Sequence, residues 1–148
     1  MATGTVRLHR ILRTKPAKVF RAFIDADALT RWLPPNGFTA KVHELDARVG
    51  GTHRMSFTNF STGNGHAFGG EYLEICRNER LRYTDRFDDP NLAGEMHITV
   101  VLKAVSCGTE ISIVQEGIPE AIPVDACYLG WQDSLNHLAM LVEPEIPD

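Results

Sequence analysis

The sequence predicts an α+β fold in which a strongly bent antiparallel sheet wraps around one long C-terminal helix. Apolar residues between positions 123 and 142 recur at spacings of three and four, which is typical of one helix face. Residues 38–116 instead alternate with a period of two, which indicates strands. The breaks between these strands are short and rich in Gly, Asn and Asp, so neighbouring strands should pair antiparallel.

The individual elements follow from the same patterns in chain order. Residues 5–13 alternate and predict a first strand. Residues 16–24 have helical spacing, and a second short helix capped by Asp25 or Asp27 should run through residues 29–33. Strands are then expected at residues 38–45, 51–60, 66–76, 80–87, 95–105 and 109–116, which with the first makes about seven. A helix over residues 123–142 closes the chain, because Pro144 and Pro147 disfavour its continuation.

The long helix should bury one apolar stripe and tolerate one unusual residue. Gly130 in its interior costs about 1 kcal/mol relative to alanine, so we expect another segment to approach the backbone closely there. The stripe predicted to face the core comprises Val124, Tyr128, Trp131, Leu135, Leu138 and Val142.

Composition indicates one ordinary globular domain over residues 1–148. Apolar residues make up 43% of the 148 residues and charged residues 23%. The formal net charge of −4 disfavours nucleic-acid binding. No apolar run approaches the roughly 18 residues of a membrane-spanning helix, and no secretory signal is recognisable. The three cysteines form no C-x-x-C pair, so we expect a cytoplasmic protein without metal or cofactor.

Alternation also predicts which side chains face the concave side of the sheet. Unpaired polar groups in a dry core cost roughly 1–3 kcal/mol each, so several of them on this face indicate a cavity that holds water or a ligand. Alternatively they pair with one another or lie at the rim of the sheet. The polar residues predicted to face inward are His53, Glu71, Tyr83, Asp85 and Gln115. The inward position of Glu71 requires that Leu73 and Ile75 also face inward, with no bulge near Gly69 and Gly70.

Taken together, these elements resemble the START-like (birch-pollen-allergen-like, SRPBCC) helix-grip superfamily. Within it, the chain is similar to the homologues of the activator of the heat-shock-protein-90 ATPase, which are often grouped with polyketide cyclases and lipid-transport proteins. The residues that carry the resemblance are Ala17-x-Val19-Phe20-x-Ala22-Phe23, Leu29-x-x-Trp32-Leu33, Gly50-Gly51, Gly70-Glu71-Tyr72-x-Glu74-Ile75, Glu79-Arg80-Leu81-x-Tyr83-Thr84, Gly108-Thr109-Glu110-Ile111, and Gly130-Trp131 followed by Leu135 and Leu138.

The resemblance implies a deep hydrophobic cavity between the sheet and the C-terminal helix, with a lipid, polyketide or related compound as ligand. It also implies a possible chaperone partner, although the likeness to stand-alone single-domain members leads us to expect no counterpart of the activator's extra N-terminal domain. A homodimer is possible. The expected ligand-binding residues are His53, Met55, Phe57, Phe68, Glu71, Tyr83, Asp85, Phe87, Met96, Gln115, Tyr128, Trp131 and Leu135.

Three functions fit this set of residues. The first is binding of a small hydrophobic ligand. The second is a cyclase, dehydratase or hydrolase in the same cavity, with Asp85, Glu71 or His53 as acid or base. The third is a co-chaperone-like interaction domain that stimulates a chaperone ATPase through its outer surface.

Each candidate residue also has a purely structural interpretation. Asp85 would then pair with an arginine such as Arg54 or Arg86, and Tyr128 and Trp131 would be ordinary core. Cys127 lacks an obvious base, which favours a buried thiol over a nucleophile. No metal-ligand spacing connects His53, His66 and His97. Trp32 with Pro34-Pro35 and Gly37 is a candidate lid at the cavity entrance.

Overall fold

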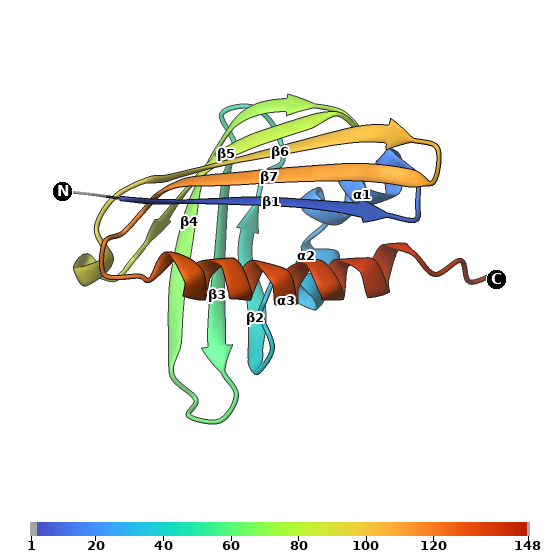
Figure 1. Ribbon diagram of the computed structural model, residues 1–148. Coiled ribbons are helices and arrows are strands. Elements are labelled where there is room, and N and C mark those ends of the chain that lie inside the picture. The colour runs from blue at the N-terminus through green and yellow to red at the C-terminus, as the bar shows by residue number, and fades with distance from the viewer. Residues whose placement is uncertain (1–2, 148) are drawn as a thin grey trace.

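A computed structural model describes residues 3–147 and contains the predicted elements in the predicted order (Figure 1). The strands pair antiparallel in one sheet of seven, so the α+β class is confirmed. The elements are β1 (Gly4–Leu12), α1 (Pro16–Ile24), α2 (Ala26–Trp32), β2 (Phe38–Leu45), β3 (Thr52–Asn59), β4 (Gly65–Cys76), β5 (Arg80–Phe87), a short 3-10 turn η1 (Pro90–Leu92), β6 (Met96–Val105), β7 (Gly108–Ile118) and α3 (Val124–Val142).

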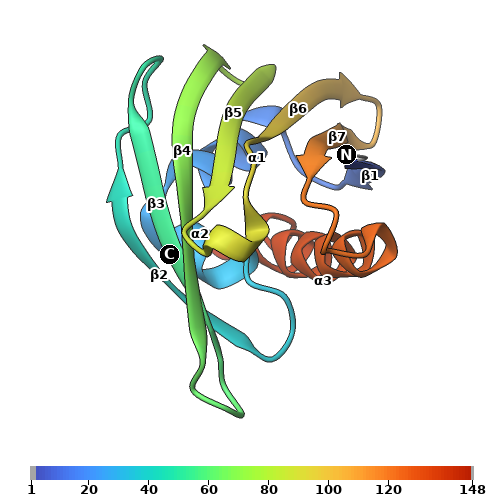
Figure 2. The same cartoon turned by 90° about the vertical axis from the view of Figure 1, so that its left-hand side faces the viewer.

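The sheet bends around α3, as the order of elements predicts. Its strand order is β1-β7-β6-β5-β4-β3-β2, so the first strand closes one edge beside the last. In Figure 1, β1, β6 and β7 run along α3, whereas β2, β3 and β4 run crosswise to it. Figure 2 shows the same sheet curving from β2 round to β1, with α3 on its concave side. This curvature lets one helix contact only part of the concave face.

The solid part of the core lies where α1 and α2 meet the C-terminal half of α3. Leu135 and Leu138 of α3 are fully buried there, together with Trp32 of α2. The Trp32 indole Nε1 donates a hydrogen bond of 2.8 Å to the carbonyl oxygen of Ala22, which fixes α2 against α1. A residue so enclosed does not move as a lid, so the predicted lid role of Trp32 is wrong.

The N-terminal half of α3 differs from the prediction. Val124 and Tyr128, assigned to the buried stripe, are each 41% exposed. Ser134, a polar residue outside the predicted stripe, is buried. The helix therefore turns a different face toward the sheet in its first turns than the large apolar residues indicate.

Strand β4 contains the second departure from the expected faces. Its pairing with β5 shifts register between Tyr72 and Glu74. Tyr72 is buried, whereas Leu73 is 37% exposed and Glu71 is exposed. The predicted inward position of Glu71 is therefore wrong, because Tyr72 rather than Leu73 faces the core in this part of the strand.

Within residues 3–147, no helix combines the length and apolar character needed to cross a membrane.

Candidate functional site

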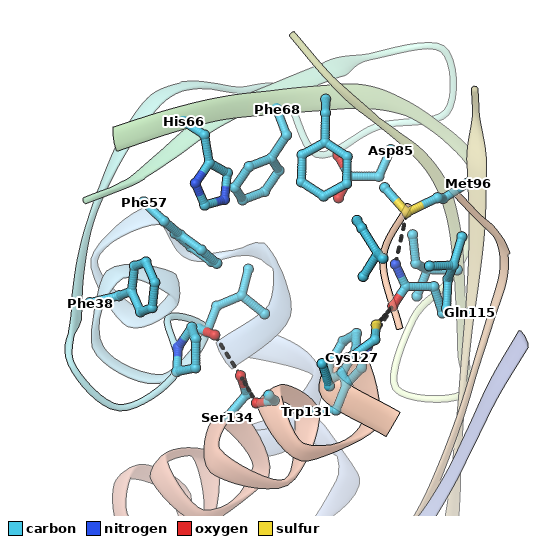
Figure 3. Close-up of a pocket in the computed structure, with 18 of the residues that line it drawn as sticks. Phe38, Phe57, His66, Phe68, Asp85, Met96, Gln115, Cys127, Trp131 and Ser134 are labelled. Carbon is cyan, nitrogen blue, oxygen red and sulfur yellow. Dashed lines mark hydrogen bonds between the residues drawn. The ribbon is translucent and has the colours of Figure 1, made fainter. Parts of the chain in front are cut away.

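A cavity of about 420 Å³ lies between the sheet and the N-terminal half of α3. Its size falls in the range of small-molecule sites, which begins at roughly 300 Å³. Figure 3 shows side chains from the sheet and from α3 pointing toward this common space. The lining residues are Leu33, Pro35, Phe38, Phe57, His66, Phe68, Tyr83, Asp85, Phe87, Met96, Ile98, Gln115, Ile118, Ile122, Ala126, Cys127, Gly130, Trp131 and Ser134.

One wall of the cavity is an aromatic cluster on β2, β3, β4 and β5. The rings of Phe57 and Phe68 meet edge to face with centroids 4.8 Å apart. His66 joins the cluster, with its ring centroid 5.9 Å from those of Phe57 and Phe87. Burial lowers the pKa of His66, which favours the neutral imidazole. This wall therefore presents uncharged ring surface to the cavity (Figure 3).

The opposite wall carries a hydrogen-bonded chain centred on Gln115 of β7. The Trp131 indole Nε1 donates to Gln115 Oε1 at 2.6 Å, and the Cys127 thiol donates to the same oxygen at 3.4 Å. An indole N–H can only donate, so the amide oxygen must face α3. The amide nitrogen consequently faces away from α3, where it donates to the Met96 thioether at 3.1 Å. A thioether is a weak acceptor, so this N–H is poorly satisfied.

Asp85 of β5 brings a carboxyl group to this wall. It pairs in register with Met96 of β6, which lies between Asp85 and Gln115 in Figure 3. Within residues 3–147, its buried Oδ1 has no hydrogen-bond partner. Desolvation raises the pKa of Asp85 from its ordinary 3.8 to about 7, although a backbone hydrogen bond from Arg86 acts in the opposite direction. A carboxyl group in this state can hold or release a proton near neutral pH.

The arginine partners considered for Asp85 are engaged elsewhere. Arg54 forms an ion pair with Asp88 at 2.5 Å. Arg86 lies 3.8 Å from Glu95 at the surface. The interpretation of Asp85 as a carboxylate paired with an arginine is therefore wrong. Glu71, another candidate acid or base, is exposed on the neighbouring strand.

The floor of the cavity is a stripe of small residues on α3. Ala126, Gly130 and Ser134 recur every four residues, with Cys127 beside them, and all line the cavity. A Cβ atom at Gly130 would meet nothing within 4 Å. The expected close approach of another segment to Gly130 is therefore wrong: the glycine opens space.

The segment after α2 is fastened to this helix. Ser134 Oγ donates to the carbonyl oxygen of Leu33 at 2.5 Å. His137 contacts the carbonyl oxygen of Pro34 at 3.1 Å and Asn36 Oδ1 at 2.7 Å through its two ring nitrogens. Pro35 in this segment lines the cavity, so part of the proposed lid region does border it.

The predicted ligand-binding residues divide into three groups. Those that line the cavity are Phe57, Phe68, Tyr83, Asp85, Phe87, Met96, Gln115 and Trp131. His53 and Met55 border a separate space of about 30 Å³ behind Asp85, and His53 Nε2 lies 3.0 Å from the carbonyl oxygen of Thr84. Glu71 is exposed, Tyr128 is partly exposed and Leu135 is closed into the core, so none of these three lines the cavity.

Sequence reasoning missed other lining residues, most of them small, aromatic or near element ends. His66 and Phe38 stood at strand starts, where alternation gives little information on facing. The small residues of α3 carry no hydrophobic signal.

His97 is exposed and lies 3.3 Å from Glu95. Within the described part of the chain, no three His, Cys, Asp or Glu side chains form a group that could hold a metal ion.

A bent antiparallel sheet that holds a C-terminal helix over an apolar cavity defines the helix-grip class of the START-like (SRPBCC) superfamily. The family model described as "Activator of Hsp90 ATPase homolog 1-like protein" matches residues 13–143, and the chain belongs to this family. No curated protein matches the chain significantly.

Solved structures show the same fold. Protein CV1439 from Chromobacterium violaceum is 60% identical over 95% of this chain and 98% of its own, with a TM-score of 0.95. Protein NE0264 from Nitrosomonas europaea is 22% identical over 93% of both chains, with a TM-score of 0.79. An Activator-of-Hsp90-ATPase-like protein from Aeromonas hydrophila is 18% identical over 95% of this chain and 92% of its own, with a TM-score of 0.77.

Proposed function

We propose that this protein binds a small hydrophobic ligand in the cavity between the sheet and α3. The observation that carries the proposal is the cavity itself, about 420 Å³ of space lined mainly by apolar and aromatic side chains. Each Å² of apolar ligand surface removed from water contributes about 25 cal/mol, so such a lining favours an apolar guest. Membership of a START-like family supports the same function.

The helix floor offers a direct test with a neutral dye, N-phenyl-1-naphthylamine, whose fluorescence rises in apolar surroundings. Gly130→Leu places a large side chain in the cavity, whereas Gly130→Ala adds one methyl group. Alanine and leucine have similar helix propensities, so the two variants differ chiefly in the volume they occupy. We expect wild type and Gly130→Ala to bind the dye, and Gly130→Leu to bind it about tenfold more weakly. Equal dye binding by all three proteins, or none by wild type, would contradict the proposal.

Native mass spectrometry of the protein purified from its own organism provides a second test. A bound hydrophobic compound should appear as an additional mass on the intact chain, and Gly130→Leu should reduce its occupancy. The same spectrum would report the possible homodimer.

An acid–base enzyme in the same cavity is the second candidate, and Asp85 is the observation that favours it. Its buried carboxyl group, with a pKa raised to about 7, has the properties of a general acid or base. The exposed Glu71 does not support this role, and His53 borders the smaller space behind Asp85. Under this hypothesis, Asp85→Asn abolishes turnover of a bound compound without abolishing its binding.

The family description also names an activator of a chaperone ATPase, and a co-chaperone role remains a prediction for this chain. An ATPase assay of Hsp90 with and without the protein would test it. An unchanged ATPase rate would remove this hypothesis without affecting the proposed ligand binding.

A further inference from the structure

The two walls of the cavity differ in chemistry: one is aromatic and the other carries polar groups. The aromatic wall of Phe57, His66 and Phe68 presents ring faces and edges. The opposite wall holds the Gln115 amide, which donates to the Met96 thioether, and the carboxyl group of Asp85, the residue that pairs in register with Met96. Figure 3 shows these walls on either side of the same space. An apolar body lying against the rings would therefore direct a single polar end toward Asp85.

Both polar groups of this wall have unused hydrogen-bonding capacity. Asp85 Oδ1 is buried and has no partner within residues 3–147. Among residues 3–147, the Gln115 amide nitrogen donates only to the flexible thioether of Met96, which a ligand can displace. Among the described residues that line the cavity there is no lysine or arginine. An anionic head group would thus meet a carboxyl group and no cation, whereas a head group with N–H or O–H donors would satisfy Asp85.

Building on the proposed ligand binding, we infer that the cavity selects an apolar or aromatic compound with one hydrogen-bond-donating head group, an amine above all, and rejects carboxylates. The amine gains an ion pair with the Asp85 carboxylate, and its charge is compatible with the adjoining ring faces. An alcohol can donate one hydrogen bond to the Asp85 carboxylate but lacks the charge. A carboxylate opposes the charge of Asp85.

The other titratable groups around Asp85 do not supply a competing charge near neutral pH. Tyr83 of β5 and Tyr72 of β4 have pKa values raised by burial and by the neighbouring Asp85, so both stay neutral phenols. Burial lowers the pKa of His53 on β3 and of His66 on β4. Burial raises the pKa of the Cys127 thiol on α3. The charges of Asp46 and Arg54 act on Tyr72 and His53, respectively; both side chains are half-exposed and are paired with Arg48 and Asp88.

Competition against bound N-phenyl-1-naphthylamine tests the inference with octylamine, octanol and octanoate, which share one apolar body. At about pH 8.5, where Asp85 is ionised, we expect octylamine to displace the dye at about tenfold lower concentration than octanol, because charge-assisted hydrogen bonds are the stronger ones. Octanoate should require a higher concentration than octanol. At about pH 5.5 the carboxyl group is protonated, and the amine-to-alcohol ratio should approach one.

Asp85→Asn provides the matched variant, because it keeps the shape of the side chain and removes its charge. Within this variant the amine and the alcohol should compete equally at both pH values. Glu71→Gln removes an exposed carboxylate from the neighbouring strand and should keep the ratio of wild type. The pH comparison on wild type needs no variant, so the test stands even if Asp85→Asn folds poorly.

Three outcomes overturn the inference. Octanoate competing as well as octylamine would exclude selection against carboxylates. An amine preference that is independent of pH in wild type, or retained in Asp85→Asn, would exclude Asp85 as its source. Absence of dye binding in wild type would remove the proposed function as well, and is thereby distinguished from a failure of head-group selection alone.

Discussion

Replacing Asp85 by asparagine should stabilise the protein at alkaline pH. The folded state raises the pKa of Asp85 from 3.8 to about 7, so between these values the folded chain binds more protons than the unfolded chain. Stability contributed by the protonated form is therefore complete below 3.8, falls as pH rises toward about 7, and stays lost above it. Asparagine keeps the shape but never ionises.

The size of this effect follows from the same two pKa values. The gap between 3.8 and about 7 corresponds to roughly 4 kcal/mol at 1.36 kcal/mol per pKa unit. Asp85 borders the open cavity and is only partly buried as a residue, so water screens its charge. We therefore expect Asp85→Asn to raise the free energy of unfolding by about 2 kcal/mol at pH 8.5 relative to wild type, and by much less at pH 4.

Urea denaturation followed by circular dichroism at pH 4, 6, 7 and 8.5 measures this difference. Glu71→Gln is the control, since an exposed carboxylate should change stability by less than about 0.5 kcal/mol at every pH. The difference between Asp85→Asn and wild type isolates Asp85 from other titrating groups. A variant that is less stable than wild type at pH 8.5, or a difference that does not vary with pH, would refute the reasoning.

Three further predictions follow from other groups in the structure. Gln115→Leu removes the acceptor of the Trp131 indole N–H and should destabilise the fold by about 1–3 kcal/mol with a shift in tryptophan fluorescence, whereas an unchanged urea midpoint would contradict the bond. Burial lowers the pKa of His53, so stability should fall as pH decreases below 6.5, and this loss should be smaller in His53→Gln by thermal denaturation at pH 5 and 7.5. Gly70→Ala would place a Cβ atom 2.0 Å from the Thr84 carbonyl oxygen and should therefore lower the melting temperature. Gly130→Ala meets no neighbouring atom and should raise the melting temperature, because alanine favours the helix by about 1 kcal/mol over glycine. The opposite order of melting temperatures would refute the assigned surroundings of both glycines.

Alternation predicted the sheet well because each strand turns one face toward the core. The inward positions of Tyr83, Asp85 and Phe87 followed from Leu81 alone, and the structure places all three at the cavity. The predicted inward position of Glu71 is wrong because β4 changes register between Tyr72 and Glu74. A single irregularity of this kind reverses which side of the sheet the neighbouring residues face.

The helix floor could not be predicted from hydrophobic periodicity. That signal follows large apolar side chains, and it selected Val124 and Tyr128, which are partly exposed. The cavity-facing residues Ala126, Gly130 and Ser134 are small, because larger ones would fill the space. Sequence patterns locate a packed face readily, but a face that preserves empty volume carries little apolar signal.

The small stripe on α3 also has an evolutionary consequence. Ala126, Gly130 and Ser134 lie on one helix, whereas the strand pairing that holds the other cavity walls in place belongs to the sheet. Enlarging or shrinking any of these side chains would resize the compartment without altering strand pairing. If the cavity binds a ligand as proposed, homologues with the same scaffold would accept ligands of different sizes through substitutions on this one helix face, and sequence divergence there should follow the ligand rather than the fold.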